Sequence, residues 1–375
     1  MSYMSPYAAV IAAALLAGGT GCGIGGPLRP PEVSSREIGP LKFVDGVRAR
    51  DGGYGARIGD RMVFVFGDTV TRRPGVDGQS WRSSTWCWTN DFEAADGLEN
   101  LQDPVDANGV PGEFLPFTEE ERAYNEAHRG DKCKEDCGAR WALWPGPVVP
   151  APDGKGALVL YGKIHARPGE WDFYGVGSSI AVWEDFAKPP RRPVVQPGKP
   201  EPALLFQKDE SVEMSGALTA GGTLYVFSCN TKGLECPCTL ARVPYAGALE
   251  RGKWRFWAGK GEWTGEPGKA MVVMNGAPMI SVHWNRYLKK YLAIYSTPLV
   301  NTISIRTAER MEGPWSDAKV VHQGLPPARK ENWDYCGLAH PELAKDGGRV
   351  EFVTYYRPGE LFDGDIRLVE LTFAP

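Results

Sequence analysis

Two aspartates, Asp51 and Asp68, are the residues whose type and spacing best fit a catalytic role. They belong to the stretch RARDGGYGARIGDRMVFVFGDTVT at 48–71, which is typical of a β-hairpin. Residues 62–66 form a continuous apolar run, and Gly59-Asp60 suits a two-residue turn before it. With that turn Asp51 faces Asp68, at a Cβ separation of about 4.5–5.5 Å where like charges are unfavourable. Paired carboxylates at such spacing are used in glycosidic bond cleavage.

A structural interpretation of the two aspartates is also open. A one-residue bulge could separate them, and Asp68 could then cap a turn through its side chain.

The apolar strand of this hairpin recurs along the chain, which predicts a repeat architecture. The copies lie at 157–161, 223–227, 291–295 and 350–355, and each follows a shorter strand and a turn. Fourth strands are expected at 113–117, 192–195, 254–257 and 319–322, with 41–44 closing the last unit. These units predict an all-β fold, a five-bladed β-propeller over residues 38–375. The rival interpretation is a two-domain β-sandwich.

The propeller topology predicts where a site lies. Asp51 starts a first strand and Asp68 ends a second strand, so both belong at one mouth of the central channel, together with Glu213 at the start of the third unit. A glycosidase needs one protonated and one ionised carboxyl group, and neighbouring carboxylates drive their pKa values apart. We expect Asp51 to be the base or nucleophile and Asp68 to be the acid. Glu213 is the third member, as an alternative acid or a modulator of the pKa values.

Substrate-binding residues are expected around the same mouth. The loop at 163–177, KIHARPGEWDFYGVG, combines aromatic residues that can stack on sugar rings with polar residues that can bind hydroxyl groups. His340, in CGLAHPEL, is expected in the last channel-lining strand, where it either faces the channel and holds water or an ion, or fills the channel. The predicted binding residues are Trp144, Lys163, His165, Arg167, Trp171, Tyr174, His340 and Arg357.

An insertion at 118–140 makes the first unit longer than the others. Thr118 and Glu121 form a capping-box pattern that predicts a short helix. The segment precedes a channel-lining strand, so we expect it to be a lid or wall at the functional mouth.

Composition narrows the functional classes. The chain has 375 residues, of which 13 are Trp, 46 Gly and 31 Pro, and frequent turn formers favour an all-β fold. The formal net charge is −4, and no basic stripe indicates nucleic acid binding. No Gly-rich phosphate loop, HExxH or GxSxG motif indicates a nucleotide, a zinc protease or a serine hydrolase. We expect a monomer with a polysaccharide substrate, without a cofactor or a metal.

The first residues are typical of an export signal. Residues 7–19 are apolar and Ala-rich but too short to span a bilayer comfortably, and Gly21-Cys22 fits the end of a bacterial lipoprotein signal. Residues 1–22 are therefore expected to be a signal peptide with a lipobox, and residues 23–37 a tether. The predicted location is the outer membrane or cell surface, with a lipid anchor on Cys22 as the only membrane contact, or otherwise secretion.

Seven cysteines follow Cys22, and export makes disulfides permissible. Cys133 and Cys137 are close enough to pair, and Cys229 can pair with Cys236 or Cys238. Cys87 and Cys336 have no assigned partner.

Several motifs resemble one bacterial family, long classed as a domain of unknown function. They are Asp51-Gly52-Gly53, VFVFGDT at 63–69, ISIRTAERMEGPWS at 303–316 and LAHPEL at 338–343. The family contains five-bladed propellers related in architecture to the arabinanase and β-xylosidase clan, and includes endo-D-arabinanases. The resemblance covers about residues 38–375. It implies a secreted glycoside hydrolase with carboxylates at the channel mouth, and endo action on D-arabinan is an activity found in that family. Asp51 and Asp68 match the motif positions, whereas the insertion and WRSSTWCW at 81–88 depart from the pattern.

Two other functional classes remain open from the sequence. A non-catalytic glycan-binding propeller needs the aromatic loop but not the facing aspartates, and a surface scaffold needs neither.

Overall fold

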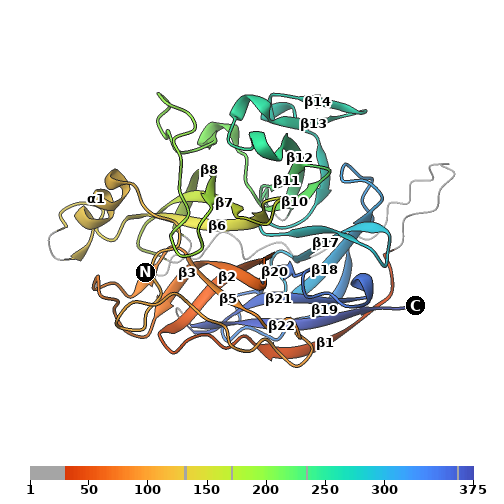
Figure 1. The fold of residues 1–375 in the computed structure, drawn as a ribbon, viewed down its shortest axis with the longest axis horizontal. Helices are drawn as coiled ribbons and strands as arrows, with labels where there is room; N and C mark the ends of the chain where they lie inside the picture. Colours follow the sequence, from red (N-terminus) through yellow and green to blue (C-terminus); the bar gives the residue numbers. More distant parts are fainter. Residues whose placement is uncertain (1–29, 131–132, 170–171, 234, 361–362) are drawn as a thin grey trace, which may run out of the picture.

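The computed structural model describes residues 30–130, 133–169, 172–233, 235–360 and 363–375. Five antiparallel sheets follow one another around a ring, so the protein is a five-bladed β-propeller (Figure 1). The innermost strands contact one another in chain order, and the last contacts the first, which closes the ring. The predicted signal peptide, Cys22 and residues 23–29 of the predicted tether lie outside the described residues. No helix in the described ranges is long and apolar enough to cross a membrane.

Each blade is built from antiparallel strands that follow one another outward from the channel. Blade one contains β2 (Val47–Ile58), β3 (Arg61–Thr71), β4 (Trp81–Arg82) and β5 (Thr85–Thr89), and blade two contains β6 (Arg140–Pro150), β7 (Ala157–Ala166), β8 (Phe173–Trp183) and β9 (Phe206–Gln207). Blade three contains β10 (Gly216–Ala220), β11 (Thr223–Cys229), β12 (Pro237–Pro244), β13 (Arg255–Gly259), β14 (Glu262–Thr264) and β15 (Val272–Asn275). Blade four contains β16 (Ser281–Asn285), β17 (Lys290–Ser296), β18 (Thr302–Ala308) and β19 (Lys319–Gln323), and blade five contains β20 (Tyr335–Ala339), β21 (Val350–Pro358), β22 (Gly364–Phe373) and β1 (Val33–Pro40).

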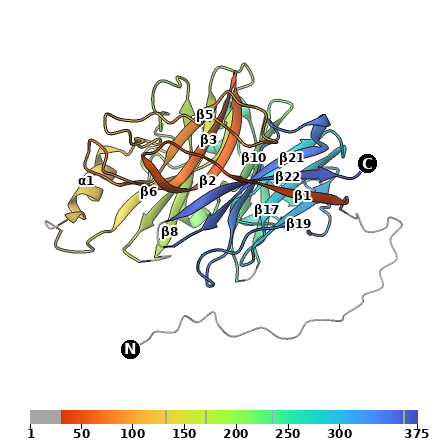
Figure 2. The ribbon, with the colours of Figure 1, turned by 90° about the horizontal axis from the view of Figure 1, so that it is seen from below.

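The helical segments are short. They include α1 (Glu119–Ala127) and the 3-10 turns Lys208–Glu210, Tyr245–Gly247, Arg251–Lys253, Pro267–Lys269 and Asp346–Gly348. Helix α1 projects from one side of the ring (Figures 1 and 2).

The N-terminal strand closes the last blade, as expected, but it is a different stretch from the predicted one. Strand β1 pairs with β22 from Val33 to Pro40, whereas 41–44 is not a strand. The strand therefore starts within the 23–37 range that the sequence assigned to a tether.

Two of the four other predicted outer strands are confirmed. Strands β13 and β19 cover most of 254–257 and all of 319–322. Residues 113–117 are not a strand, because β4 and β5 both pair with β3 and complete blade one without them. The prediction for residues 192–195 is also wrong, since the outer position of blade two is taken by β9.

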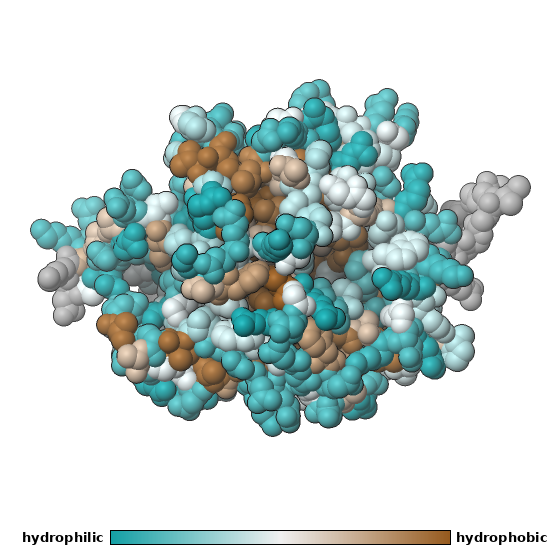
Figure 3. All heavy atoms as spheres, viewed as in Figure 1, coloured by the Kyte–Doolittle hydropathy of each residue, from teal (hydrophilic) through white to brown (hydrophobic). Residues whose placement is uncertain are grey.

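Apolar side chains pack mainly between neighbouring blades. Trp183 of blade two is completely buried, and its ring meets those of Trp86 and Phe114 edge-on at 4.6 and 4.8 Å. Ile294 of blade four and Val353 of blade five share another buried cluster. The surface seen in Figure 3 is mostly hydrophilic, with apolar residues gathered in separate patches.

The structure pairs four of the cysteines. Cys133 bonds to Cys137 as predicted, and Cys229 bonds to Cys238, one of its two predicted partners. Cys87, Cys236 and Cys336 are buried free thiols.

Candidate active site

The opening hairpin places Asp51 and Asp68 side by side through an irregular register. Ladder pairing follows the predicted two-residue turn as far as Tyr54 and Val65, but then Gly52 pairs with Phe66 and Arg50 with Thr69. Between those two pairs β2 has only Asp51, whereas β3 has Gly67 and Asp68. The directly opposed pair that the sequence predicted is therefore replaced by a bulge. Asp51 therefore lies against both Gly67 and Asp68. Bulges often occur next to active sites, where they change the direction of a side chain.

Gly67 makes room for the Asp51 carboxylate. A Cβ atom at position 67 would lie 2.7 Å from Asp51 Oδ1. On the other strand, Gly52 and Gly53 have φ values of +91° and +107°, which residues with a Cβ rarely adopt. The glycines of the Asp51-Gly52-Gly53 and Gly67-Asp68 sequences are therefore needed for Asp51 and Asp68 to lie side by side.

Each aspartate is held by a donor from a neighbouring blade. The Trp144 indole Nε1 of β6 donates to Asp68 Oδ1 at 3.1 Å. The Tyr335 hydroxyl of β20 donates to Asp51 Oδ2 at 3.0 Å. Both aspartates remain partly exposed. The pair is thus fixed by blades two and five while still open to solvent, and Asp68 is not a turn cap buried among backbone N–H groups.

The environment favours retention of protons by both carboxyl groups. Burial and, to a smaller degree, the charge of Asp68 raise the pKa of Asp51 to about 7, while the Tyr335 hydroxyl opposes this shift. Burial also raises the pKa of Asp68, to about 6, while the charge of Arg140 and the indoles of Trp144 and Trp81 lower it. Close carboxylates resist double ionisation, so the pair holds about one proton near neutral pH.

Arg140 and Trp81 are site residues that the sequence did not reveal. The Arg140 guanidinium carbon lies 4.2 Å from the centre of the Trp81 ring, and its charge acts on Asp68. Trp81 lies in WRSSTWCW, and Arg140 is the last residue of the predicted insertion. In the sequence, only the position of each residue at the start of a strand, at the channel mouth that contains Asp68, could have indicated a role in the site.

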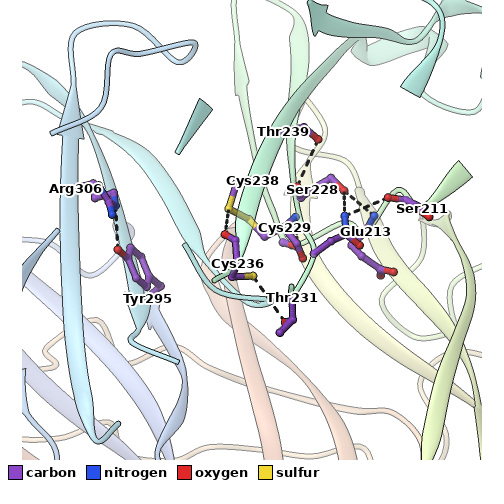
Figure 4. Close-up of a disulfide and its surroundings, with 12 residues drawn as sticks. Ser211, Glu213, Ser228, Cys229, Thr231, Cys236, Cys238, Thr239, Tyr295 and Arg306 are labelled. Atoms are coloured by element: carbon purple, nitrogen blue, oxygen red, sulfur yellow. Dashed lines mark hydrogen bonds between the residues drawn. A yellow bond between two sulfur atoms is a disulfide. The ribbon is translucent and has the colours of Figure 1, made fainter. Parts of the chain in front are cut away.

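Glu213 lies before the innermost strand of blade three, which starts at Gly216 instead of the predicted 213. Its backbone N–H donates to Ser228 Oγ of β11 at 2.8 Å, next to the Cys229–Cys238 disulfide (Figure 4). Burial raises the pKa of the Glu213 carboxyl group. Within the described ranges, no hydrogen bond joins Glu213 to either aspartate.

Blade two supplies an aromatic wall, which we define as Trp144 and Phe173; Tyr174, next to Phe173 in β8, pairs with His165 and lies on the other face of the sheet. The rings of Trp144 and Phe173 meet edge-on at 4.9 Å, and Phe173 and Tyr174 are each 41% exposed. Lys208 Nζ lies 4.2 Å from the centre of the Tyr174 ring. Because Trp144 also holds Asp68, the wall is continuous with the carboxylate pair.

Two other predicted binding residues lie in the same hairpin. His165 is only partly buried, and its Nε2 lies 2.8 Å from the Tyr124 hydroxyl of α1. Arg167 and Asp172 are exposed and form an ion pair of 3.0 Å at the hairpin end. Trp171 lies outside the described residues.

The insertion forms the predicted capped helix. The Thr118 side chain accepts from the backbone of Glu121, and the Glu121 carboxylate accepts from the backbone of Thr118. Glu121 also pairs with Arg192 at 2.6 Å, and this bond and charge hold its pKa at about 2 despite burial. The helix is thus fastened to blade two through Arg192, which follows β8.

Two predicted binding residues are structural instead. Lys163 is 4% exposed and bridges Glu121 at 3.0 Å and Glu201 at 2.7 Å, so its charge is already satisfied. His340 is completely buried, and its Nε2 lies 2.8 Å from Thr354 Oγ1. Burial lowers the pKa of His340 to about 3, so it is a neutral filler and does not face solvent.

Arg357 lies at the end of β21, on the same rim as Asp51. Its Nε donates to the Pro326 carbonyl at 2.9 Å, and its guanidinium lies 4.0 Å from Asp365. It is partly exposed, so the prediction that it binds substrate remains open.

The opposite end of the channel contains a cavity of about 200 Å³ lined by residues including Tyr54, His283 and Glu342. His283 Nε2 lies 3.0 Å from Glu351 Oε1. Among the described residues, no group of three or more His, Cys, Asp or Glu side chains is arranged to hold a metal ion.

The chain matches one protein family and many solved structures. Residues 176–356 match the family described as a domain of unknown function, DUF4185. No curated protein sequence matches the chain.

Three solved structures illustrate the structural likeness. A protein from Bacteroides ovatus shares 14% identity at a TM-score of 0.55, covering 90% of this chain and 87% of that one. A family 117 glycoside hydrolase from Zobellia galactanivorans shares 10% identity at a TM-score of 0.53, covering 91% and 90%. A GH43_1 enzyme from Xanthomonas citri shares 11% identity at a TM-score of 0.50, covering 90% and 91%. These likenesses show the propeller fold.

Proposed function

We propose that the protein is a glycoside hydrolase that cleaves a furanose-rich polysaccharide, with Asp51 and Asp68 as its catalytic carboxylates. The observation that carries the proposal is the pair itself. Two neighbouring carboxyl groups with raised pKa values open to solvent at one rim, and each is oriented by a donor from another blade. Such pairs cost stability and are found where acid–base chemistry needs them.

The surroundings of the pair suggest the role of each aspartate. The charge of Arg140 and two indole N–H groups favour the ionised form of Asp68, so the shared proton resides on Asp51. This reverses the roles expected from the sequence. Asp51 donates its proton to the glycosidic oxygen as that oxygen leaves the anomeric carbon. In a retaining reaction Asp68 bonds to that carbon, and water deprotonated by Asp51 then breaks the resulting glycosyl ester and frees Asp68. In an inverting reaction Asp68 removes a proton from the water that attacks that carbon directly.

The substrate class rests on the aromatic wall and on the sequence resemblance. Exposed rings next to the carboxylate pair can stack on sugar rings. The motifs shared with a family that includes endo-D-arabinanases favour D-arabinan, cleaved internally. We also propose that the enzyme is a monomer, exported and either secreted or held to a membrane by a lipid on Cys22.

The test is hydrolysis by the purified protein of D-arabinan, L-arabinan and xylan, measured as reducing-sugar release. Asp51→Asn and Asp68→Asn should each abolish release from the active substrate and leave its affinity unchanged. Asp60→Asn is the matched control, since Asp60 lies exposed in the turn of the same hairpin and should keep full activity. Activity that survives both active-site variants would contradict the proposed carboxylate roles.

A second candidate function is non-catalytic glycan binding, favoured by the exposure of Phe173 and Tyr174. In that case the wild type releases no sugar from any glycan it binds, and Phe173→Ala loses affinity while Asp51→Asn does not.

A further inference from the structure

A third residue contacts the carboxylate pair from a distant part of the sequence. Tyr335 starts the innermost strand of blade five, 284 residues from Asp51 in the chain. Its ring packs on that of Tyr356 in β21 with centroids 4.9 Å apart. Its hydroxyl group donates to Asp51 Oδ2.

An irregularity in β20 determines which side chain faces Asp51. Tyr335 pairs with Tyr356, whereas Leu338 pairs with Thr354, so β20 has one extra residue between these pairs. If the Leu338 register continued without the extra residue, Cys336 would stand opposite Tyr356. A one-residue shift exchanges the faces of a strand. The bulge therefore places Tyr335 on the face of Leu338, which packs in the cluster that contains Tyr54 of β2.

The bulge is retained although its backbone is unfavourable. Cys336 has a φ value of +57°, an uncommon conformation that strains a residue with a Cβ. A Cβ atom on Gly337 would lie 2.5 Å from the backbone nitrogen of Ser296, so only glycine fits there. Backbone strain of this kind clusters at functional sites.

We propose that Tyr335 is a positioning residue for Asp51, aimed by the bulge at Cys336 and Gly337. The proposal rests on the proposed function, because it gives Tyr335 the task of holding the carboxyl group that supplies the proton. The hydroxyl fixes one oxygen of Asp51 and so sets the direction of the other.

The groups around Asp51 support this role. Asp68 from β3, Tyr335 and Cys336 from β20 and Tyr356 from β21 are the titratable groups that act on Asp51 or feel its charge. Burial and the neighbouring Asp51 raise the pKa of the Tyr335 phenol well above its ordinary range. Tyr335 therefore keeps its proton and acts as a donor at every pH at which the pair titrates.

The test compares Tyr335→Phe with Tyr356→Phe as the matched control. Both variants remove one hydroxyl group from a packed tyrosine pair, but only Tyr335 bonds to Asp51. The first measurement is the titration midpoint of the Asp51 carboxyl carbon by NMR, with the resonance assigned from its loss in Asp51→Asn. Tyr335→Phe should raise the midpoint by about one pH unit, because a hydrogen bond to the charged form is lost.

The second measurement is turnover. Tyr335→Phe should lower kcat by about 10–100-fold with little change in KM, since a misplaced catalytic group affects the transition state more than binding. The alkaline limb of its pH–rate profile should move upward together with the midpoint.

A midpoint that is unchanged in Tyr335→Phe, or that shifts equally in Tyr356→Phe, would overturn the proposal. If the wild type hydrolyses no glycan, the function proposed above fails, while the NMR midpoint still tests whether Tyr335 controls Asp51.

Discussion

The contact between Gly67 and Asp51 gives the sharpest test of the site geometry. A Cβ atom at position 67 would lie 2.7 Å from Asp51 Oδ1, whereas non-bonded heavy atoms prefer about 3.5–4.0 Å. In Gly67→Ala the carboxylate must therefore retreat by roughly 1 Å. Gly67 is not among the residues with positive φ, so alanine can adopt the same backbone conformation and the effect falls on Asp51.

A displacement of this size should cost catalysis more than stability. A misplacement of about 1 Å can reduce the rate by about 100-fold. The stability loss should stay near about 1 kcal/mol, because the clashing atom is the end of a short, partly exposed side chain. The hydrogen bond from Tyr335 to Asp51 Oδ2, 3.0 Å long in the wild type, should also be disturbed.

The assay is kcat and KM for reducing-sugar release, with thermal unfolding measured in parallel. Gly112→Ala is the control, because a Cβ atom there meets nothing within 4 Å. Gly67→Ala should lose about 100-fold in kcat with a small change in Tm, and Gly112→Ala should match the wild type. If Gly67→Ala keeps kcat within about threefold, Asp51 does not act from its position beside Gly67.

Three further predictions concern charge. Activity should follow a bell-shaped pH profile, falling below about pH 6 as Asp68 gains its proton and above about pH 7 as Asp51 loses its own. Arg140→Gln should move the acidic limb upward by about one pH unit, because a nearby positive charge lowers a carboxyl pKa, and an unmoved limb would show that Arg140 does not lower the pKa of Asp68. The folded-state pKa of Asp51 is raised, so its protonation stabilises the fold fully below about pH 4 and this contribution is lost as pH rises through about 7. At pH 8 the free energy of unfolding of Asp51→Asn should therefore exceed that of the wild type by on the order of 1–2 kcal/mol, seen as a higher melting temperature, and equal melting at pH 8 would contradict the shift. Arg192→Met should destabilise the protein by about 3–5 kcal/mol, because it leaves the buried Glu121 carboxylate with only Lys163 as a counter-ion. Chemical denaturation measures this loss of stability, and a loss below about 1 kcal/mol would show that Glu121 is solvated.

The sequence by itself determined the features that depend on neighbouring residues. The apolar run at 62–66 and the Gly59-Asp60 turn were sufficient for the opening hairpin, because strand period and turn chemistry are local. The Thr118 and Glu121 spacing was sufficient for the helix start for the same reason. Recurrence of the hairpin pattern was sufficient for the five blades, since each blade repeats one local unit.

Only the tertiary structure decided which groups meet across the ring. Lys163 lies in an aromatic hairpin that suggests substrate binding. Its charge is nevertheless paired with Glu121 and Glu201, which belong to other segments of the chain. The contact of Tyr335 with Asp51 depends on a one-residue bulge and on ring closure by blade five. Burial, bulges and interblade contacts are set by packing between segments far apart in the sequence. The spacing of residues along the chain does not predict that packing.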